Sequence, residues 1–206
     1  MDKKETTDYF RSNIFEAYGA YNGWKMIMGS KSVGIVSKEM AERYVKIQQH
    51  HHNFFGLAER AFLIQFVLLS LHSFDSDDRS FSLYKVNELK TKEFIAANKS
   101  VLDSLFDLRN KLFAHRDVPT DKSTVVQYKI PSIIDLDQFF KNLMDFYNQL
   151  TSVVDGSSTM FSNAEDIKRD IEFLFMNIYR GEDVRKKEIE IHWSWMENKG
   201  KISDIV

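Results

Sequence analysis

Proline is nearly absent from this chain, and its scarcity constrains the fold more than any other sequence feature. The 206 residues contain only Pro119 and Pro131, which bracket one short segment. Proline interrupts helices because it lacks a backbone N–H donor and clashes with the preceding turn. On both sides of that segment, apolar residues recur every three or four positions, the pattern of amphipathic helices. The sequence therefore predicts an all-α fold.

The expected helices end where glycine, proline or polar clusters interrupt this periodicity. They cover residues 7–28, 37–72, 81–90, 98–116, 135–154 and 163–180. We expect an up-and-down bundle of long helices over residues 1–155. Residues 156–206 are expected to form a C-terminal helical extension packed on the same domain.

Two stretches break the helical pattern. Residues near 123–131 are rich in β-branched side chains and predict a short extended or hairpin segment. Residues 191–200 alternate apolar and polar positions, which predicts a short strand or a docking tail. Within that second stretch, we expect Trp193 and Trp195 to be packed anchors.

Composition narrows the cellular setting and the classes of partner. The formal net charge is −2, so non-specific coating of nucleic acid is not expected, and any nucleic-acid contact should use a local basic site. There is no cysteine, which excludes disulfides and thiolate chemistry. The apolar run 61–71 is shorter than a membrane span and is expected to belong to a core helix. With no apolar leader pattern at residues 1–10, we expect a cytoplasmic protein without a membrane segment.

Arg109 occupies an unusual position in the helix expected over residues 98–116. Advancing about 100° per residue places it near the middle of an arc formed by Leu102, Leu105, Phe106, Leu112 and Phe113. Burying an unpaired guanidinium is unfavourable by several kcal/mol. Two interpretations remain open. Arg109 either has a carboxylate partner or a snorkelling stem inside a closed bundle, or the arc opens onto a cleft that binds an anion.

His115 lies on the edge of the same arc, in the last turn before Pro119. Helical side chains lean toward the amino terminus, so its imidazole is expected to tilt toward Arg109. The two side chains could therefore line one groove without forming a close pair. A structural role is the alternative for a single histidine at such an edge.

The histidine run at 50–52 does not predict a metal site. Successive helical residues point about 100° apart, so three adjacent histidines cannot converge on one ion. We expect His51 to be a hydrogen-bonded core residue, whereas His50 and His52 are expected at the surface or its edge. No metal or other cofactor is predicted.

The string "RNKLFAH", residues 109–115, resembles the signature of HEPN domains (higher eukaryotes and prokaryotes nucleotide-binding). With the flanking sequence, residues 10–155 are similar to the abortive-infection-type branch of that superfamily. The resemblance implies a helical domain that forms a homodimer with a composite cleft, and a metal-independent endoribonuclease that serves as a toxin or phage-defence effector. An antitoxin-like protein partner is a further expectation.

The resemblance also implies roles for five residues. His115 would be the general acid or base, and Arg109 would hold the scissile phosphate. Asn110 would contact the phosphate or ribose, although its helical position points partly away from the arc. Arg116 and Lys111 would be accessory substrate contacts, and a solvated pair with Asp107 is the alternative for Lys111.

Two other readings of the sequence stay open. The first is a non-catalytic helical module that uses the same motif to bind a nucleotide, RNA or a protein. The second is a purely structural bundle in which Arg109 pairs with a carboxylate of its own chain.

Overall fold

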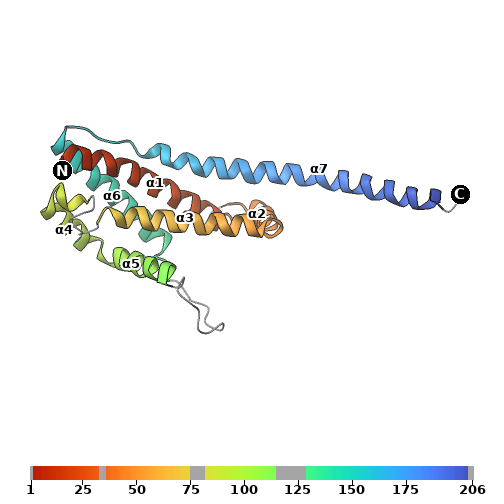
Figure 1. The fold of residues 1–206 in the computed structure, drawn as a ribbon, viewed down its shortest axis with the longest axis horizontal. Coiled ribbons are helices and arrows are strands. Elements are labelled where there is room, and N and C mark those ends of the chain that lie inside the picture. The colour runs from red at the N-terminus through yellow and green to blue at the C-terminus, as the bar shows by residue number, and fades with distance from the viewer. Residues whose placement is uncertain (1, 33–35, 75–81, 115–128, 204–206) are drawn as a thin grey trace.

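The computed structural model describes residues 2–32, 36–74, 82–114 and 129–203, and these form the all-α fold that the sequence predicts. The long helices lie alongside one another in a bundle, and one of them extends far beyond it (Figure 1). The elements are α1 (Lys3–Gly29), α2 (Lys38–His50), α3 (His52–His72), η1 (Leu83–Lys85), α4 (Glu88–Ala97), α5 (Lys99–Ala114), α6 (Ile133–Val154), η2 (Ser162–Glu165) and α7 (Asp166–Ser203). The described residues include no β-strand.

Short polar side chains fix where several of these helices begin. In each case an extended residue before the first turn accepts a hydrogen bond from a backbone N–H two or three residues later, which satisfies one otherwise unpaired donor. The capping residues are Asp2 for α1, Ser37 for α2, Asn87 for α4 and Ser132 for α6. At the other end of α6, Gly156 has a φ of 74°, a conformation that suits glycine and ends the helix.

The main core lies between α1, α3 and α6, and Tyr21 of α1 is at its centre. Its ring is fully buried and stacks on Phe140 of α6 with the centroids 4.7 Å apart. Its hydroxyl donates a hydrogen bond of 2.7 Å to Asp137 Oδ1. The same carboxylate accepts from Lys25 Nζ at 2.6 Å, so one acidic residue of α6 holds two side chains of α1.

The prediction of one continuous helix over residues 37–72 is wrong. His51 leaves the helical conformation with φ −114° and ψ 36°, and the chain continues as α3 in a new direction (Figure 1). The reason is tertiary. Phe175 of α7 stacks on Tyr44 of α2 at 4.4 Å and on Phe55 of α3 at 4.9 Å, so both helices pack around one ring.

The segment between α3 and α5 also differs in detail from the prediction. Instead of one helix over residues 81–90, the chain forms the single turn η1, and Asn87 then starts α4, which continues to Ala97. Most of the expected extended segment near 123–131 lies outside the described residues. Residues 129–132 form neither helix nor strand.

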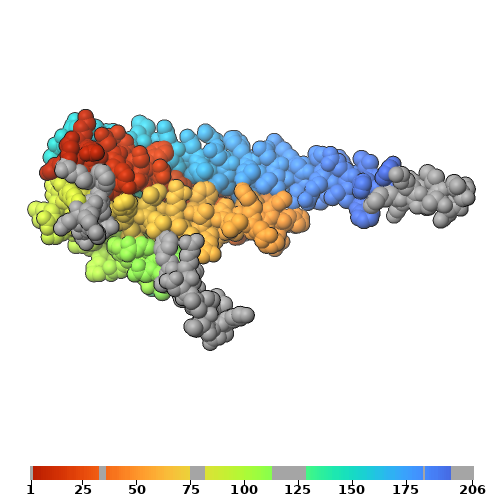
Figure 2. Space-filling view, in the orientation of Figure 1, coloured from red at the N-terminus to blue at the C-terminus, as the bar shows by residue number. Residues whose placement is uncertain are grey.

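α7 differs most from the prediction, because it continues as a helix through the stretch expected to be a strand or tail. Its first half packs on the body through Ile171 and Phe175. Its second half projects past α2 and α3 (Figures 1 and 2). Trp193 and Trp195 are 60% and 53% exposed, so within this chain they are not the packed anchors that we expected.

α3 contains the apolar run 61–71 and is longer than that run alone. By length and composition it is the one helix among the described residues that could cross a membrane. In the structure it packs against α1, and Phe66, Val67 and Leu71 are buried in the main core. Core packing therefore accounts for part of its apolar character.

Candidate active site

α5 carries the Arg-Asn pair of the motif and presents two distinct faces. Leu102, Leu105, Leu108 and Leu112 recur every three or four residues and are buried in the main core. The opposite face is solvated and carries ion pairs four residues apart. These pairs join Lys99 to Asp103 at 2.6 Å and Lys111 to Asp107 at 2.7 Å.

Arg109 lies on the apolar side of α5 and is itself half-buried. By helical position it falls between the buried residues Leu102 and Leu105. Its guanidinium carbon lies 5.0 Å from the centroid of the Phe106 ring, one turn earlier. This contact is a cation–π interaction that shields the apolar part of the side chain and leaves the N–H donors available.

No carboxylate among the described residues forms an ion pair with Arg109. The hydrogen bond that it makes is a long one of 3.4 Å from the guanidinium to Oδ1 of the neighbouring Asn110. The closed-bundle interpretation with an internal ion pair therefore finds no support in this part of the chain. A guanidinium in this setting keeps most of its capacity to bind a phosphate or carboxylate.

A hollow of about 690 Å³ lies beside Arg109, between the carboxyl-terminal end of α3 and the middle of α5. Its lining is mostly apolar, and several of these side chains are only half-buried. Two lining residues, Arg109 and His72, can carry positive charge. The full lining is Leu68, Leu69, Leu71, His72, Phe74, Phe106 and Arg109.

The remaining predicted site residues have different surroundings. Asn110 is exposed and accepts the long hydrogen bond from Arg109. The predicted pairing of Lys111 with Asp107 is confirmed at 2.7 Å. His115 and Arg116 lie outside the described residues. The functional roles assigned to all of these side chains stay predictions.

His72 is the residue of this hollow that the sequence reasoning missed. It is the last residue of α3 and lies three positions after Leu69, where the apolar stripe of that helix was thought to end. Extending the stripe by one more step of three would have placed His72 on the face that turns toward α5.

The histidine run is organised by a residue that sequence spacing could not find. Glu182 of α7 is 132 positions from His50, and its Oε1 lies 2.9 Å from His50 Nδ1. His51 Nε2 is 4.0 Å from the same oxygen, and His51 is half-buried, so its predicted core position is wrong. Across the described ranges, no group of three His, Cys, Asp or Glu side chains is arranged to hold a metal ion.

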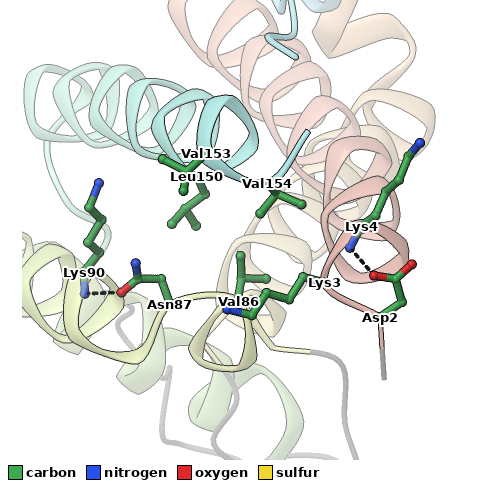
Figure 3. Close-up of a pocket in the computed structure, with 9 residues that line it drawn as sticks. All are labelled: Asp2, Lys3, Lys4, Val86, Asn87, Lys90, Leu150, Val153 and Val154. Atoms are coloured by element: carbon green, nitrogen blue, oxygen red, sulfur yellow. Dashed lines mark hydrogen bonds between the residues drawn. The ribbon is translucent and has the colours of Figure 1, made fainter. Parts of the chain in front are cut away.

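A second hollow, of about 380 Å³, lies where the start of α1 meets the η1–α4 junction and the end of α6 (Figure 3). Its apolar floor includes Val86 and Leu150, and Lys3, Lys4 and Lys90 are among its lining residues. It contains none of the predicted site residues. We therefore take the Arg109 hollow as the candidate active site.

An all-α domain that carries Arg109 and Asn110 on a helix beside an open hollow has the architecture expected of a HEPN domain. The chain belongs to the HEPN family AbiU2, whose profile matches residues 15–173, more than half of the 206 residues. The matched range contains the whole of α5 and continues beyond residue 155 into the first turns of α7. No curated protein and no solved structure matches the chain.

Proposed function

We propose that this HEPN protein is a metal-independent endoribonuclease that binds the scissile phosphate of RNA at Arg109 and uses His115 for proton transfer. The observation that carries the proposal is the setting of Arg109. Its half-buried guanidinium is stacked on Phe106, has no carboxylate partner in the described residues and lines a hollow of about 690 Å³. A structural arginine is usually paired or extended into solvent.

The reaction proposed is attack of the ribose 2′-oxygen on the neighbouring phosphorus. A 2′-O–P bond forms and the P–O5′ bond breaks, so the 2′-hydroxyl loses a proton and the leaving 5′-oxygen gains one. The products are a 2′,3′-cyclic phosphate and a 5′-hydroxyl. His115 would carry out one of these proton transfers, because imidazole is suited to acid–base work near neutral pH.

Arg109 would act on the charge that develops at phosphorus. Guanidinium has five N–H donors in a planar fork, which matches two phosphate oxygens at once. Donors fixed before the reaction stabilise the transition state more than the ground state, where the phosphate carries less charge. Asn110 would orient this fork, Arg116 would contact neighbouring phosphates, and Lys111 would do so after release from Asp107.

The half-buried leucines of the hollow support a homodimer with a composite cleft as part of the proposal. Leu68 and Leu69 of α3 lie beside Phe106 of α5 without being fully buried within one chain. A second copy that covers part of this surface would remove apolar area from water and bring two Arg109 sites into one cleft. A toxin or phage-defence role in the cytoplasm, controlled by an antitoxin-like partner, completes the proposal.

The test is a cleavage assay on a panel of RNAs with chelator present. Arg109→Ala should lower the cleavage rate by on the order of 10³-fold, the effect expected of a transition-state arginine. His115→Ala should lower the rate by on the order of 10²–10⁴-fold. Both variants should stay folded and dimeric. The proposal fails if the wild-type protein leaves every RNA intact, or if Arg109→Ala cleaves at the wild-type rate.

Arg43 provides the matched control for Arg109. It is also an arginine whose guanidinium lies over an aromatic ring, 4.6 Å from the centroid of Tyr179, but it belongs to α2 and does not line the hollow. Arg43→Ala should cleave RNA like the wild type. Equal losses in the Arg43 and Arg109 variants would indicate a general effect of removing stacked cations.

A non-catalytic protein-interaction module is the second candidate function, and the projecting half of α7 favours it. Ile189, Ile191, Trp193 and Trp195 of this half are 45–68% exposed. Exposed aromatic and aliphatic side chains in a group are typical of protein-binding surfaces. No RNA cleavage in the same assays, together with a protein partner whose binding is lost when Trp193 and Trp195 are replaced by alanine, would favour this candidate.

A further inference from the structure

The proposed reaction needs two proton transfers, and the motif supplies one histidine per chain. One group must accept the proton of the 2′-hydroxyl, and another must donate a proton to the leaving 5′-oxygen. A metal-independent mechanism leaves both tasks to side chains or to water. A second group able to transfer a proton is therefore required beside Arg109, a requirement that rests on the proposed function.

His72 meets the chemical requirement, because it lines the same hollow as Arg109. Its ring stands edge-on to two aromatic side chains of α1, with centroids 5.7 Å from Tyr9 and 6.1 Å from Phe10. These contacts hold the plane of the imidazole, and their interplanar angles are 75° and 88°. Such positioning is what a proton-transfer group requires.

The ring nitrogens of His72 are available for a ligand. Within the part of the chain that the structure describes, the imidazole makes these ring contacts and no hydrogen bond. By contrast, His50 uses its Nδ1 to contact Glu182 at 2.9 Å. A half-buried imidazole that makes no hydrogen bond among the described residues, and that lines the same hollow as Arg109, is the arrangement expected where a substrate supplies the missing partner.

The electrostatic surroundings suit a proton donor once phosphate is bound. His72 ends a 21-residue helix, whose last carbonyl groups carry partial negative charge at this end of the hollow. Tyr9 of α1 contacts its ring, and Arg109 of α5 lines the same hollow. A phosphate anion bound at Arg109 would attract an imidazolium that lines the same hollow.

We propose that His72 is the general acid of the cleavage reaction and donates its proton to the leaving 5′-oxygen. In this assignment the scissile phosphate binds to Arg109, and the 5′-linked nucleoside lies toward the α3 end of the hollow. The proton released from the 2′-hydroxyl goes to the general base, which is then His115. The proton given to the 5′-oxygen comes from the His72 imidazolium. Charge and atoms balance, and the enzyme returns to its starting state after the two histidines exchange a proton with solvent.

A substrate with a better leaving group distinguishes a general acid from a residue that only binds substrate or packs the fold. Uridine 3′-(4-nitrophenyl phosphate) releases nitrophenolate, which departs without protonation, whereas an RNA oligonucleotide releases a 5′-alkoxide that needs a proton. His72→Gln should lower kcat on the oligonucleotide by on the order of 10²–10⁴-fold. On the activated ester, the same variant should stay within about tenfold of the wild type, because general-acid assistance no longer contributes.

Two further variants distinguish loss of proton transfer from loss of folding or of ring packing. His72→Phe keeps an aromatic ring against Tyr9 and Phe10 but cannot transfer a proton, so it should behave like His72→Gln. His192 of α7 also has an aromatic contact, 6.2 Å from Trp195, and is far from the hollow, so His192→Gln should cleave both substrates like the wild type.

The outcomes distinguish the two proposals. If the wild type cleaves RNA and both His72 variants cleave it equally well, the assignment of His72 is overturned and the proposed function stands. Equal losses on both substrates would also overturn it, because a packing or binding role lowers both rates. If the wild type cleaves neither substrate, the proposed function and this assignment fail together.

Discussion

Replacing Phe175 by alanine should be among the most destabilising single changes in this protein. Phe175 is fully buried, and its ring lies between Tyr44 at 4.4 Å and Phe55 at 4.9 Å, with interplanar angles of 25° and 8°. It is the point at which α7 holds both α2 and α3. The substitution therefore tests whether the first half of α7 is part of the folded body.

The expected magnitude follows from this burial. Truncating a core phenylalanine to alanine lowers the free energy of unfolding by about 3–5 kcal/mol. The upper half of that range is expected, because two aromatic stacks, each contributing about 0.5–1.5 kcal/mol beyond area burial, are lost together. For a domain of this size such a change lowers Tm by roughly 8–20 °C.

The assay is urea unfolding followed by far-UV circular dichroism, with Phe173→Ala as the matched control. Phe173 is the same residue type on the same helix, only two positions away, but it is 53% exposed. Its replacement should change the free energy of unfolding by about 0.5–1 kcal/mol at most. Equal effects of the two substitutions would refute the packing described for α7.

Two other predictions use the same unfolding assay. Burial, followed by the 2.6 Å hydrogen bond to Glu165, raises the pKa of Tyr18 from 10.0 to about 12. The native state therefore holds this proton more tightly than the unfolded chain does. The resulting contribution of Tyr18 to the free energy of unfolding is fully present below pH 10 and is lost as the pH rises through 12. In the Tyr18→Phe variant, the free energy of unfolding should fall less between these pH values than in the wild type. An equal fall in both proteins would contradict the raised pKa of Tyr18. Gly56→Ala should stabilise α3 by about 0.5–1 kcal/mol, because the added Cβ meets no atom within 4 Å. Gly23→Ala should show no such gain, because its Cβ would lie 3.0 Å from the Phe62 ring. Equal gains at both glycines would refute this packing.

Periodicity predicted the helices whose boundaries depend on local chemistry. α6 is the clearest case, because its stripe of Leu136, Phe140, Leu143 and Tyr147 repeats at helical spacing and Ser132 caps its first turn. The expected range 135–154 differs from the observed helix only at its first residues. Local propensity and burial agree throughout this segment, so sequence alone is sufficient.

Where the prediction was wrong, contacts between distant segments decide the structure. Nothing in the residues around His51 signals a helix end, and the break reflects the way α2 and α3 both pack on Phe175 of α7. Similarly, the pairing of His50 with Glu182 spans 132 positions. Such contacts leave no periodic signal in a single sequence.

In the candidate site, too, the sequence predicted what a local pattern marks and missed what contacts between distant segments bring together. The motif pointed to Arg109, and the helical count identified it as an anomaly. Phe106, which the count placed on the same arc, packs against the main core and also lies under the Arg109 guanidinium. His72 was missed because it belongs to another helix, and only the packing of α3 against α5 brings it to the hollow.

The central claim is that Arg109 serves phosphodiester chemistry, and the most direct test is to identify the ends of RNA fragments produced with chelator present. Mass spectrometry of the fragments should find 2′,3′-cyclic phosphate and 5′-hydroxyl termini with the wild type and with Arg43→Ala, and none above background with Arg109→Ala. Intact RNA after incubation with the wild type, or the same fragments in the same yield from Arg109→Ala, would contradict the account.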